Sequence, residues 1–318
     1  MDQRIKQVLL VCACFFALHM QGMAESLSDS AGALDAKRAL DAGDYAKAAK
    51  LLRPLAEQGL AQAQLSLGVM YTQGNGVPRD YTEALKWHRL AAEQGLADAQ
   101  FNLGLIYASG EGVPRDYVEA AKWYLLAAEQ GLDEAQDNLG DMYSKGNGVP
   151  QDYKAAMKWH RLAAEQGLAS AQFNLGAMYF LGQGTARDHR LAVRWWKQAA
   201  EHGLAKAQFN LGLMYDLGNG VSQDHKEAMK WYRLAAEQGD AKSQLNLGVM
   251  YGNGQGVPRD HVSAYMWAYL AAANETSGEI DRLAADVLDY LAKQMDAGQI
   301  AETQERARRC AANKFKGC

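Results

Sequence analysis

The segment Gln73–Tyr81 reads QGNGVPRDY and combines two glycines with an aspartate, residue types that can bind a phosphate group or a metal ion. A phosphate site at a helix N-terminus needs free backbone N–H groups and usually a lysine. Here Asp80 stands where a helix is expected to begin, so its carboxylate would accept those N–H groups as an N-cap. A negative charge already fills the anion position. The segment therefore predicts a turn between two helices and no phosphate site.

The motif occurs six times at a constant spacing of 36 residues. Its glycine pairs are Gly74 and Gly76, Gly110 and Gly112, Gly146 and Gly148, Gly182 and Gly184, Gly218 and Gly220, and Gly254 and Gly256. The expected N-caps are Asp80, Asp116, Asp152, Asp188, Asp224 and Asp260, and Glu83, Glu119 and Glu227 stand at capping-box spacing. A fixed period of this length predicts stacked repeats.

Three histidines at one repeat position suggest a metal site, because His189, His225 and His261 recur in consecutive repeats. Equivalent positions in adjacent repeats lie on the order of 10 Å apart, whereas zinc ligands stand about 2 Å from the ion. The same position holds Tyr81, Tyr117 and Tyr153 in the other repeats. We therefore expect no metal site and interpret these residues as amphipathic rings at the start of the second helix.

Catalytic chemistry has no clear candidate in this sequence. A catalytic site needs a nucleophile beside a base, or paired carboxylates in a pocket. Neither arrangement can be distinguished from the residues that simply recur in every repeat. We therefore expect no enzymatic activity, no catalytic residues and no cofactor. The formal charge of -4, with both signs interspersed, also argues against a nucleic-acid partner.

Each repeat unit is expected to contain two amphipathic helices. On a helical wheel, one face of the first helix carries Ala63, Gln64, Leu67, Gly68, Met70 and Tyr71, and these positions are expected to pack. A glycine inside a helix costs about 1 kcal/mol, so Gly68 and its equivalents predict a second helix that crosses too closely for a side chain. The second helix runs from Tyr81 to Gln94, with Trp87 on its buried face and Gly95 as its left-handed stop.

The pattern AxxQxxLGxxYxxGxGVxxDxxxAxxWxxxAAxxG at 61–95, repeated five more times, resembles the Sel1-like repeat, a relative of the tetratricopeptide repeat. The resemblance implies an all-α fold, a right-handed superhelical α-solenoid of helix-turn-helix repeats. The expected organisation is a degenerate N-terminal capping repeat at 31–60, six repeats at 61–276 and C-terminal capping helices at 279–318. The resemblance also implies that the protein is a scaffold that binds a protein or an extended peptide. The alternative is a β-lactamase-like cell-wall hydrolase, as in cysteine-rich relatives, although these repeats contain no cysteine.

In tetratricopeptide-like solenoids the outward arc of the first helices lines a concave binding face. The candidates on this arc are Phe101, Asn102, Asp137, Asn138, Asp141, Phe173, Asn174, Phe209, Asn210 and Asn246. The asparagines either hold a peptide backbone or brace neighbouring repeats. Asp137 and Asp141 interrupt an otherwise apolar stripe, so we predict that they contact a basic residue of the partner. His88 and His160 are expected on the convex face.

The N-terminus reads as a secretory signal at residues 1–24, with a basic start, a short apolar run and small residues before a cleavage site after Ala24. The alternative is a lipoprotein acylated at Cys14. The apolar run is too short to span a membrane in the mature chain. We expect a periplasmic or secreted protein, and an oxidising compartment predicts a disulfide between the two remaining cysteines, Cys310 and Cys318.

Overall fold

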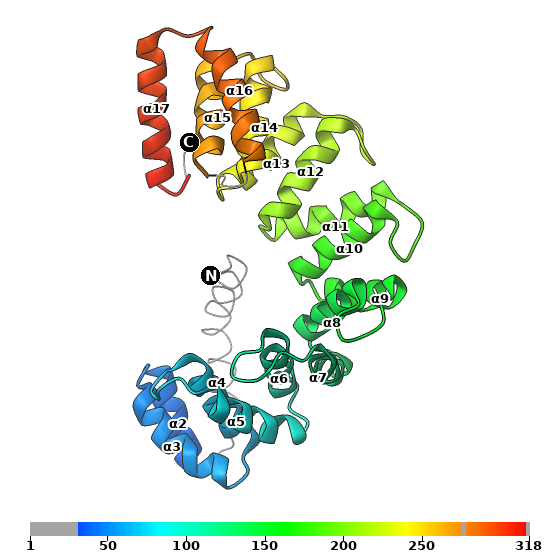
Figure 1. Cartoon of the computed structure of the whole chain (residues 1–318), viewed down its shortest axis with the longest axis vertical. Helices are drawn as coiled ribbons and strands as arrows, with labels where there is room; N and C mark the ends of the chain where they lie inside the picture. The colour runs from blue at the N-terminus through cyan, green and yellow to red at the C-terminus, as the bar shows by residue number, and fades with distance from the viewer. Residues whose placement is uncertain (1–30, 275–277, 316–318) are drawn as a thin grey trace. The chain divides into compact units, whose positions relative to one another are not determined.

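The computed structural model describes residues 31–274 and 278–315, which form sixteen α-helices and contain no strand (Figure 1). The predicted signal segment 1–24, Cys14 and Cys318 lie outside the described residues. The chain divides into two compact units, Met1–Asp152 and Tyr153–Cys318. The all-α prediction is confirmed for the part of the chain that is described.

The first unit contains seven helices among its described residues. They are α2 (Ala31–Asp41), α3 (Tyr45–Glu57), α4 (Ala61–Gln73), α5 (Tyr81–Glu93), α6 (Ala97–Ser109), α7 (Tyr117–Glu129) and α8 (Asp133–Lys145). Each helix packs against the next along the chain. One apolar cluster extends from Ala33 of α2 to Leu103 of α6. The core therefore runs through successive helix pairs, as expected when each repeat buries its apolar face against its neighbour.

The second unit contains nine helices within its described residues. They are α9 (Tyr153–Glu165), α10 (Ala169–Leu181), α11 (His189–Glu201), α12 (Ala205–Leu217), α13 (His225–Ala236), α14 (Ala241–Asn253), α15 (His261–Asn274), α16 (Glu279–Ala292) and α17 (Ala297–Ala312). The alternation of first and second helices continues through α15. Both C-terminal helices, α16 and α17, then pack against α15. Ala307 and Cys310 of α17 join Trp267 and Leu270 of α15 in one cluster.

The predicted packing face of the first helices is confirmed. In α4, the residues Ala63, Leu67 and Met70 have no exposed surface. The leucine column is buried in every repeat, at Leu67, Leu103, Leu139, Leu175, Leu211 and Leu247. Burying one such side chain contributes about 1.5–3 kcal/mol. This column is therefore a main source of cohesion within each unit.

The glycine column faces a close crossing, as predicted, but the neighbouring group is usually an aromatic ring. A Cβ built on Gly68 would stand 2.7 Å from the His88 ring. Gly104, Gly176 and Gly212 face Tyr124, Trp196 and Tyr232 in the same way. In the last repeat the neighbour is backbone, because a Cβ on Gly248 would lie 3.0 Å from the Ala264 carbonyl oxygen. The glycine makes room for a ring in most repeats.

The expectation that His88 and His160 lie on the convex surface is wrong. Their exposed fractions are 1% and 2%. His88 follows Ala84 by four residues and precedes Ala91 by three, and both alanines are buried. Residues at these spacings share one helix face, so the histidine points at the first helix and cannot serve as a surface residue.

The turn interpretation of the glycine motif is confirmed. Gly74 adopts the left-handed conformation that ends α4, with φ of 79°. Asp80 accepts hydrogen bonds from the N–H groups of Thr82 and Glu83 at 2.9 and 3.2 Å. Side-chain caps of this kind open α5, α7, α11, α13 and α15, through Asp80, Asp116, Asp188, Asp224 and Asp260. The carboxylate occupies the helix N-terminus where a phosphate would bind.

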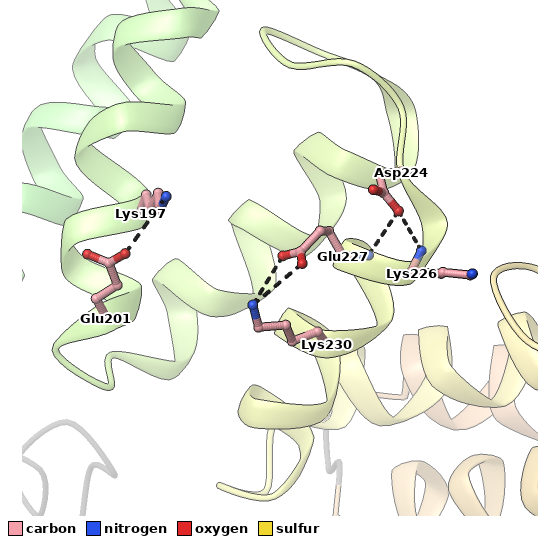
Figure 2. Close-up of polar contacts among 6 residues, drawn as sticks. All are labelled: Lys197, Glu201, Asp224, Lys226, Glu227 and Lys230. Carbon is pink, nitrogen blue, oxygen red and sulfur yellow. Dashed lines mark hydrogen bonds and ion pairs between the residues drawn. The ribbon is translucent and has the colours of Figure 1, made fainter.

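The predicted capping boxes are only half formed. The N–H group of Asp80 donates to the Tyr71 carbonyl oxygen at 3.0 Å, because the turn brings the cap residue back onto α4. Glu83 instead accepts a hydrogen bond from the Trp87 indole. The other two glutamates, Glu119 and Glu227, pair with lysines three residues on, and Figure 2 shows the second pair. A complete box opens α17, between Asp296 and Gln299.

Candidate functional site

A buried glutamine column fixes the first helices to both neighbouring second helices. Gln100 Nε2 donates to the carbonyl oxygen of Ala92, at the end of α5, and Gln100 Oε1 accepts from Gln130 Nε2, at the end of α7. The donation to an alanine carbonyl recurs for Gln64, Gln136, Gln172, Gln208 and Gln244. Both ends of the amide are therefore used in Gln100, and likewise in Gln64, Gln172, Gln208 and Gln244. Our sequence analysis assigned this column to packing and missed its hydrogen bonds, although the glutamine recurs in every repeat.

A second link between repeats joins an arginine of one second helix to a tyrosine of the next first helix. Arg89 donates to the Tyr107 hydroxyl at 2.6 Å, and Arg161 donates to the Tyr179 hydroxyl at 2.7 Å. The same contact joins Arg53 to Tyr71 and Arg233 to Tyr251. These bonds and the glutamine column hold the first helices in register, so side chains at equivalent positions form columns across a face.

The phenylalanine column of the candidate face is half-buried and contacts the second helix of its own repeat. Phe101 packs on Tyr124 with ring centroids 5.8 Å apart, and Phe209 packs on Tyr232 at 6.0 Å. Phe173 packs on Trp196 at 6.4 Å. Aromatic contacts of this kind contribute about 0.5–1.5 kcal/mol beyond burial. These rings therefore stabilise the repeat and also leave part of their surface to solvent.

The asparagine column is half-buried at all five positions, Asn102, Asn138, Asn174, Asn210 and Asn246. Burial raises the pKa of the Tyr232 hydroxyl, the Asp216 carboxylate raises it further, and the Asn246 side chain lowers it in part. Asn246 on α14 therefore lies close to the second helix of the preceding repeat. The bracing role and the peptide-binding role of the column both remain predictions.

Asp137 and Asp141 both lie on α8 and are half-buried. Asp141 pairs with Lys145 one turn further along the helix. The side chain of Asp141 keeps 41% of its surface exposed, and a pair this open contributes little to stability. Both carboxylates belong to the first unit together with Phe101 and Asn102. The candidates on α10, α12 and α14 belong to the second unit.

The second unit exposes large apolar side chains that sequence reasoning missed. Leu181 at the end of α10 and Leu217 at the end of α12 are 53% and 56% exposed, and Val249 of α14 is 36% exposed. The position of the two leucines is otherwise held by Gln73, Ser109, Lys145 and Asn253. The sequence signal for this exposure was the pair of leucines at a repeat position that is polar in the other four repeats.

The histidine column does not assemble. His189 stacks on Phe180 at 4.9 Å, and His225 Nδ1 lies 2.9 Å from an Asp216 oxygen. Both residues, like His261, begin a second helix. Within residues 31–274 and 278–315, no three histidine, cysteine or acidic side chains are grouped as metal ligands. Over the same residues, no helix combines the length and the apolar character that crossing a bilayer requires.

Paired helices joined by glycine turns, repeated at a fixed length, define this chain as an α-solenoid. The Sel1 repeat family model matches seven segments, 38–60, 61–96, 97–132, 133–168, 169–204, 205–240 and 241–275, and the chain belongs to this family. The resemblance stated from the sequence is therefore confirmed. The family's fold is generally a scaffold for protein interactions, and its members are generally not enzymes.

Solved structures of Sel1 repeat proteins resemble this chain. A Sel1 repeat protein from Oxalobacter formigenes is 36% identical, with a TM-score of 0.68 over 76% of this chain and 99% of that one. A protective antigen of uropathogenic Escherichia coli with an SLR fold is 29% identical, with a TM-score of 0.37 over 85% of this chain and 73% of that one. No curated protein matches the chain.

Proposed function

We propose that this protein is a scaffold that binds an extended segment of a partner protein along the exposed face of its first helices. The observation that carries this proposal is the exposure of Leu181, Leu217 and Val249 on consecutive first helices of the second unit. Exposed apolar side chains on neighbouring first helices suit the alternate side chains of an extended peptide. Half-buried asparagines in the same helices would offer donors and acceptors to the peptide backbone.

In the first unit, the same face would select a partner by charge. Asp137 and Asp141 add negative charge to α8, where the other first helices mostly carry apolar residues at these positions. A basic residue of the partner would meet these carboxylates. Charged contacts at an interface contribute mainly to specificity and to the association rate. Each unit would then make its own kind of contact, apolar in the second unit and charged in the first.

The test compares two charge-matched double variants for capture of a partner identified by crosslinking and mass spectrometry. Asp137→Asn with Asp141→Asn should weaken capture by roughly tenfold and flatten its dependence on salt. Glu93→Gln with Glu129→Gln removes two exposed carboxylates from second helices and should change neither. Lys145→Gln removes the ion-pair partner of Asp141 but keeps the carboxylate. This variant therefore shows whether loss of the ion pair within the helix, and not loss of the carboxylate, changes capture.

Circular dichroism should remain helical in all three variants. Capture of the same partner by the double aspartate variant, equal to wild type at every salt concentration, would refute the acidic contact. Crosslinks confined to second helices would refute the assignment of the binding face.

We also propose that the protein acts in the periplasm or outside the cell. The sequence supports this through the basic start, the short apolar run and the small residues before Ala24. An exported scaffold of this kind would serve envelope assembly, signalling regulation or contact with a host. The intact mass of the exported protein tests this proposal, because cleavage after Ala24 would leave Glu25 as the first residue.

A further inference from the structure

A cavity of about 460 Å³ lies in the second unit where α9 ends and α10 and α11 pack together. Its lining includes Glu165, Gln172, Trp195, Gln198, Glu201 and His202. The volume falls within the range of about 300–1,000 Å³ that is typical of small-ligand sites. The cavity therefore has room for a small group together with its hydrogen-bonding partners.

Two lining residues are exceptions to columns that hold in every other repeat. Gln198 stands where the other five repeats have leucine, at Leu90, Leu126, Leu162, Leu234 and Leu270. His202 stands where the others have an amide, at Gln94, Gln130, Gln166, Gln238 and Asn274. Both exceptions belong to the same helix turn and line the same cavity. The polar lining is thus a property of this repeat and does not follow from the repeat pattern.

The tryptophan in the cavity differs from three of its equivalents. In three repeats a lysine ammonium lies over the ring, with Lys86 4.8 Å from the Trp87 centroid, Lys158 5.0 Å from Trp159 and Lys230 5.3 Å from Trp231. Those three tryptophans are buried. Trp195 is half-buried and is preceded by Arg194. Among the described residues, no cation lies over its ring.

The charge of the lining is negative. Glu165 and Glu201 each contribute a carboxylate, and His202 Nδ1 lies 3.1 Å from the Gln172 amide oxygen. Lys197 Nζ lies 3.9 Å from Glu201 Oε1, and Figure 2 shows the two side chains facing each other. The lysine and glutamate side chains are 53% and 55% exposed, so this pair is weak and exchanges readily with solvent. The lining of the cavity combines a tryptophan, two carboxylates and two glutamine side chains.

We propose that this cavity binds an alkylammonium group. A cation over an exposed tryptophan is stabilised by the ring, and a carboxylate beside it adds a charge-assisted contact. In the two neighbouring repeats a lysine ammonium of the same helix lies over the tryptophan ring. Over Trp195, the ammonium of a ligand would take that position. The ammonium comes either from a lysine side chain of a partner protein or from a free amine. The carboxylates and the tryptophan of this site come from second helices, so the site differs from the proposed peptide-binding face.

The direct test follows the resonance of 5-fluorotryptophan at position 195 by ¹⁹F NMR, assigned with Trp195→Phe in the full-length mature protein. The probes are Nα-acetyl-lysine amide, the uncharged Nα-acetyl-norleucine amide and tetramethylammonium, at matched ionic strength. A saturable shift with either cation and none with norleucine amide supports the site. Tighter binding of lysine amide points to a protein side chain, and tighter binding of tetramethylammonium points to a free amine.

Trp123 provides an internal control. Its lysine, Lys122, pairs with Glu119 instead of covering the ring, and the surrounding columns carry the usual Leu126 and Gln130. Its resonance should therefore stay unchanged. A shift at Trp123 as large as at Trp195, an equal response to norleucine amide, or no saturable shift with either cation would overturn the proposal.

Variants test the lining. Gln198→Leu with His202→Gln restores the column residues, which five other repeats accommodate, and should keep the fold while weakening binding by at least about tenfold. Glu165→Gln removes one carboxylate from an exposed position and should also cost roughly tenfold. Lys197→Gln removes a competing cation and should strengthen binding by roughly twofold. Unchanged binding in both Glu165→Gln and the column-restoring variant would refute the assignment.

Discussion

At the scale of single residues, His88 is a histidine that is buried between the two helices of its repeat. Its exposed fraction is 1%, and burial lowers its pKa from 6.5 to about 3. Its Nδ1 atom has no hydrogen-bond partner among the described residues, and its Nε2 atom lies 3.4 Å from the Thr72 hydroxyl. The side chain is therefore neutral in the folded protein throughout the physiological range.

This burial predicts a loss of stability in mild acid. Because the folded-state pKa lies below the unfolded value, the unfolded chain binds a proton at this site that the folded chain does not, from about pH 6.5 downward. At pH 5 the contribution amounts to about 2 kcal/mol of lost stability. His88→Tyr, the residue type found at Tyr124 and Tyr232, should remove this part of the pH dependence.

Urea unfolding at pH 7 and pH 5, followed by circular dichroism, measures the effect. The difference between the two pH values should be smaller in His88→Tyr than in wild type. An equal difference in both proteins would show that His88 does not titrate as its burial requires.

The sequence predicted which residues share a face, but it could not identify their contacts. Helical periodicity was sufficient to place Gln64 and Leu67 on the packing face. It could not show that the glutamine amide joins the two flanking helices, because those partners lie eight residues before and thirty residues after it. His88 was misplaced because its polar residue type suggested exposure, although its spacing from Ala84 and Ala91 puts it on the buried face.

At the scale of an element, the two glycines of each turn have different roles. Gly110 ends α6 in the left-handed conformation with φ of 77°. Gly112 also has positive φ, at 75°, and a Cβ built on it would overlap the Tyr81 side chain in the preceding second helix. The turn was predictable from glycine and aspartate alone. The contact between repeats was not, because it depends on how one repeat stacks on the next.

The contact between repeats at Gly112 predicts that alanine is more destabilising there than at Gly95, which also has positive φ but no close neighbour. Gly95 has φ of 90° and open space around a Cβ, so Gly95→Ala should cost only conformational strain, about 1–2 kcal/mol. Gly112→Ala adds the overlap with Tyr81 and should cost about 1–3 kcal/mol more. Thermal unfolding of the two variants provides the comparison. Equal destabilisation would mean that the repeats can shift apart without penalty.

The candidate sites also combine features that the repeat pattern predicts with features that only the packing of neighbouring helices determines. The columns of Phe101 and Asn102 could be predicted from the sequence, and the structure adds that the phenylalanine packs on Tyr124. The exposure of Leu181 and the cavity beside Trp195 had only indirect sequence signals, because exposure at a helix position depends on what the neighbouring helices cover. In hindsight, the exceptions at Gln198 and His202 were the visible signal.

At the scale of the whole molecule, the solenoid depends on contacts between neighbours, and its last repeat is covered by helices outside the repeat pattern. Leu270 is 1% exposed, whereas its equivalents Leu90 and Leu126 are 38% and 43% exposed. The difference arises because α17 contributes Ala307 and Cys310 to the cluster that contains Leu270. Stability in a repeat protein is roughly a sum of repeat and interface terms, so a change in α17 should act mainly on the second unit.

Cys310 connects this local packing to the compartment in which the protein works. It is buried against the last repeat, and its predicted partner Cys318 is the remaining cysteine of a chain cleaved after Ala24. Closing a nine-residue ring would contribute roughly 2.6 kcal/mol in the chain-entropy treatment, before any strain is subtracted. An oxidising compartment would maintain the bridge, and a reducing one would not.

We therefore predict that protein purified after export begins at Glu25 and contains the Cys310–Cys318 bridge. Intact mass should match that mature chain less two hydrogens, and alkylation should label both cysteines only after reduction. Reduction should lower the stability of the second unit and leave hydrogen exchange in α4 to α7 unchanged, because contacts in a solenoid act between neighbours. Cys318→Ser, which removes the bridge without altering the buried Cys310, is the matched control and should not respond to reductant. A lipid adduct at Cys14 would contradict the cleavage site, and two thiols that react without reduction would contradict the bridge.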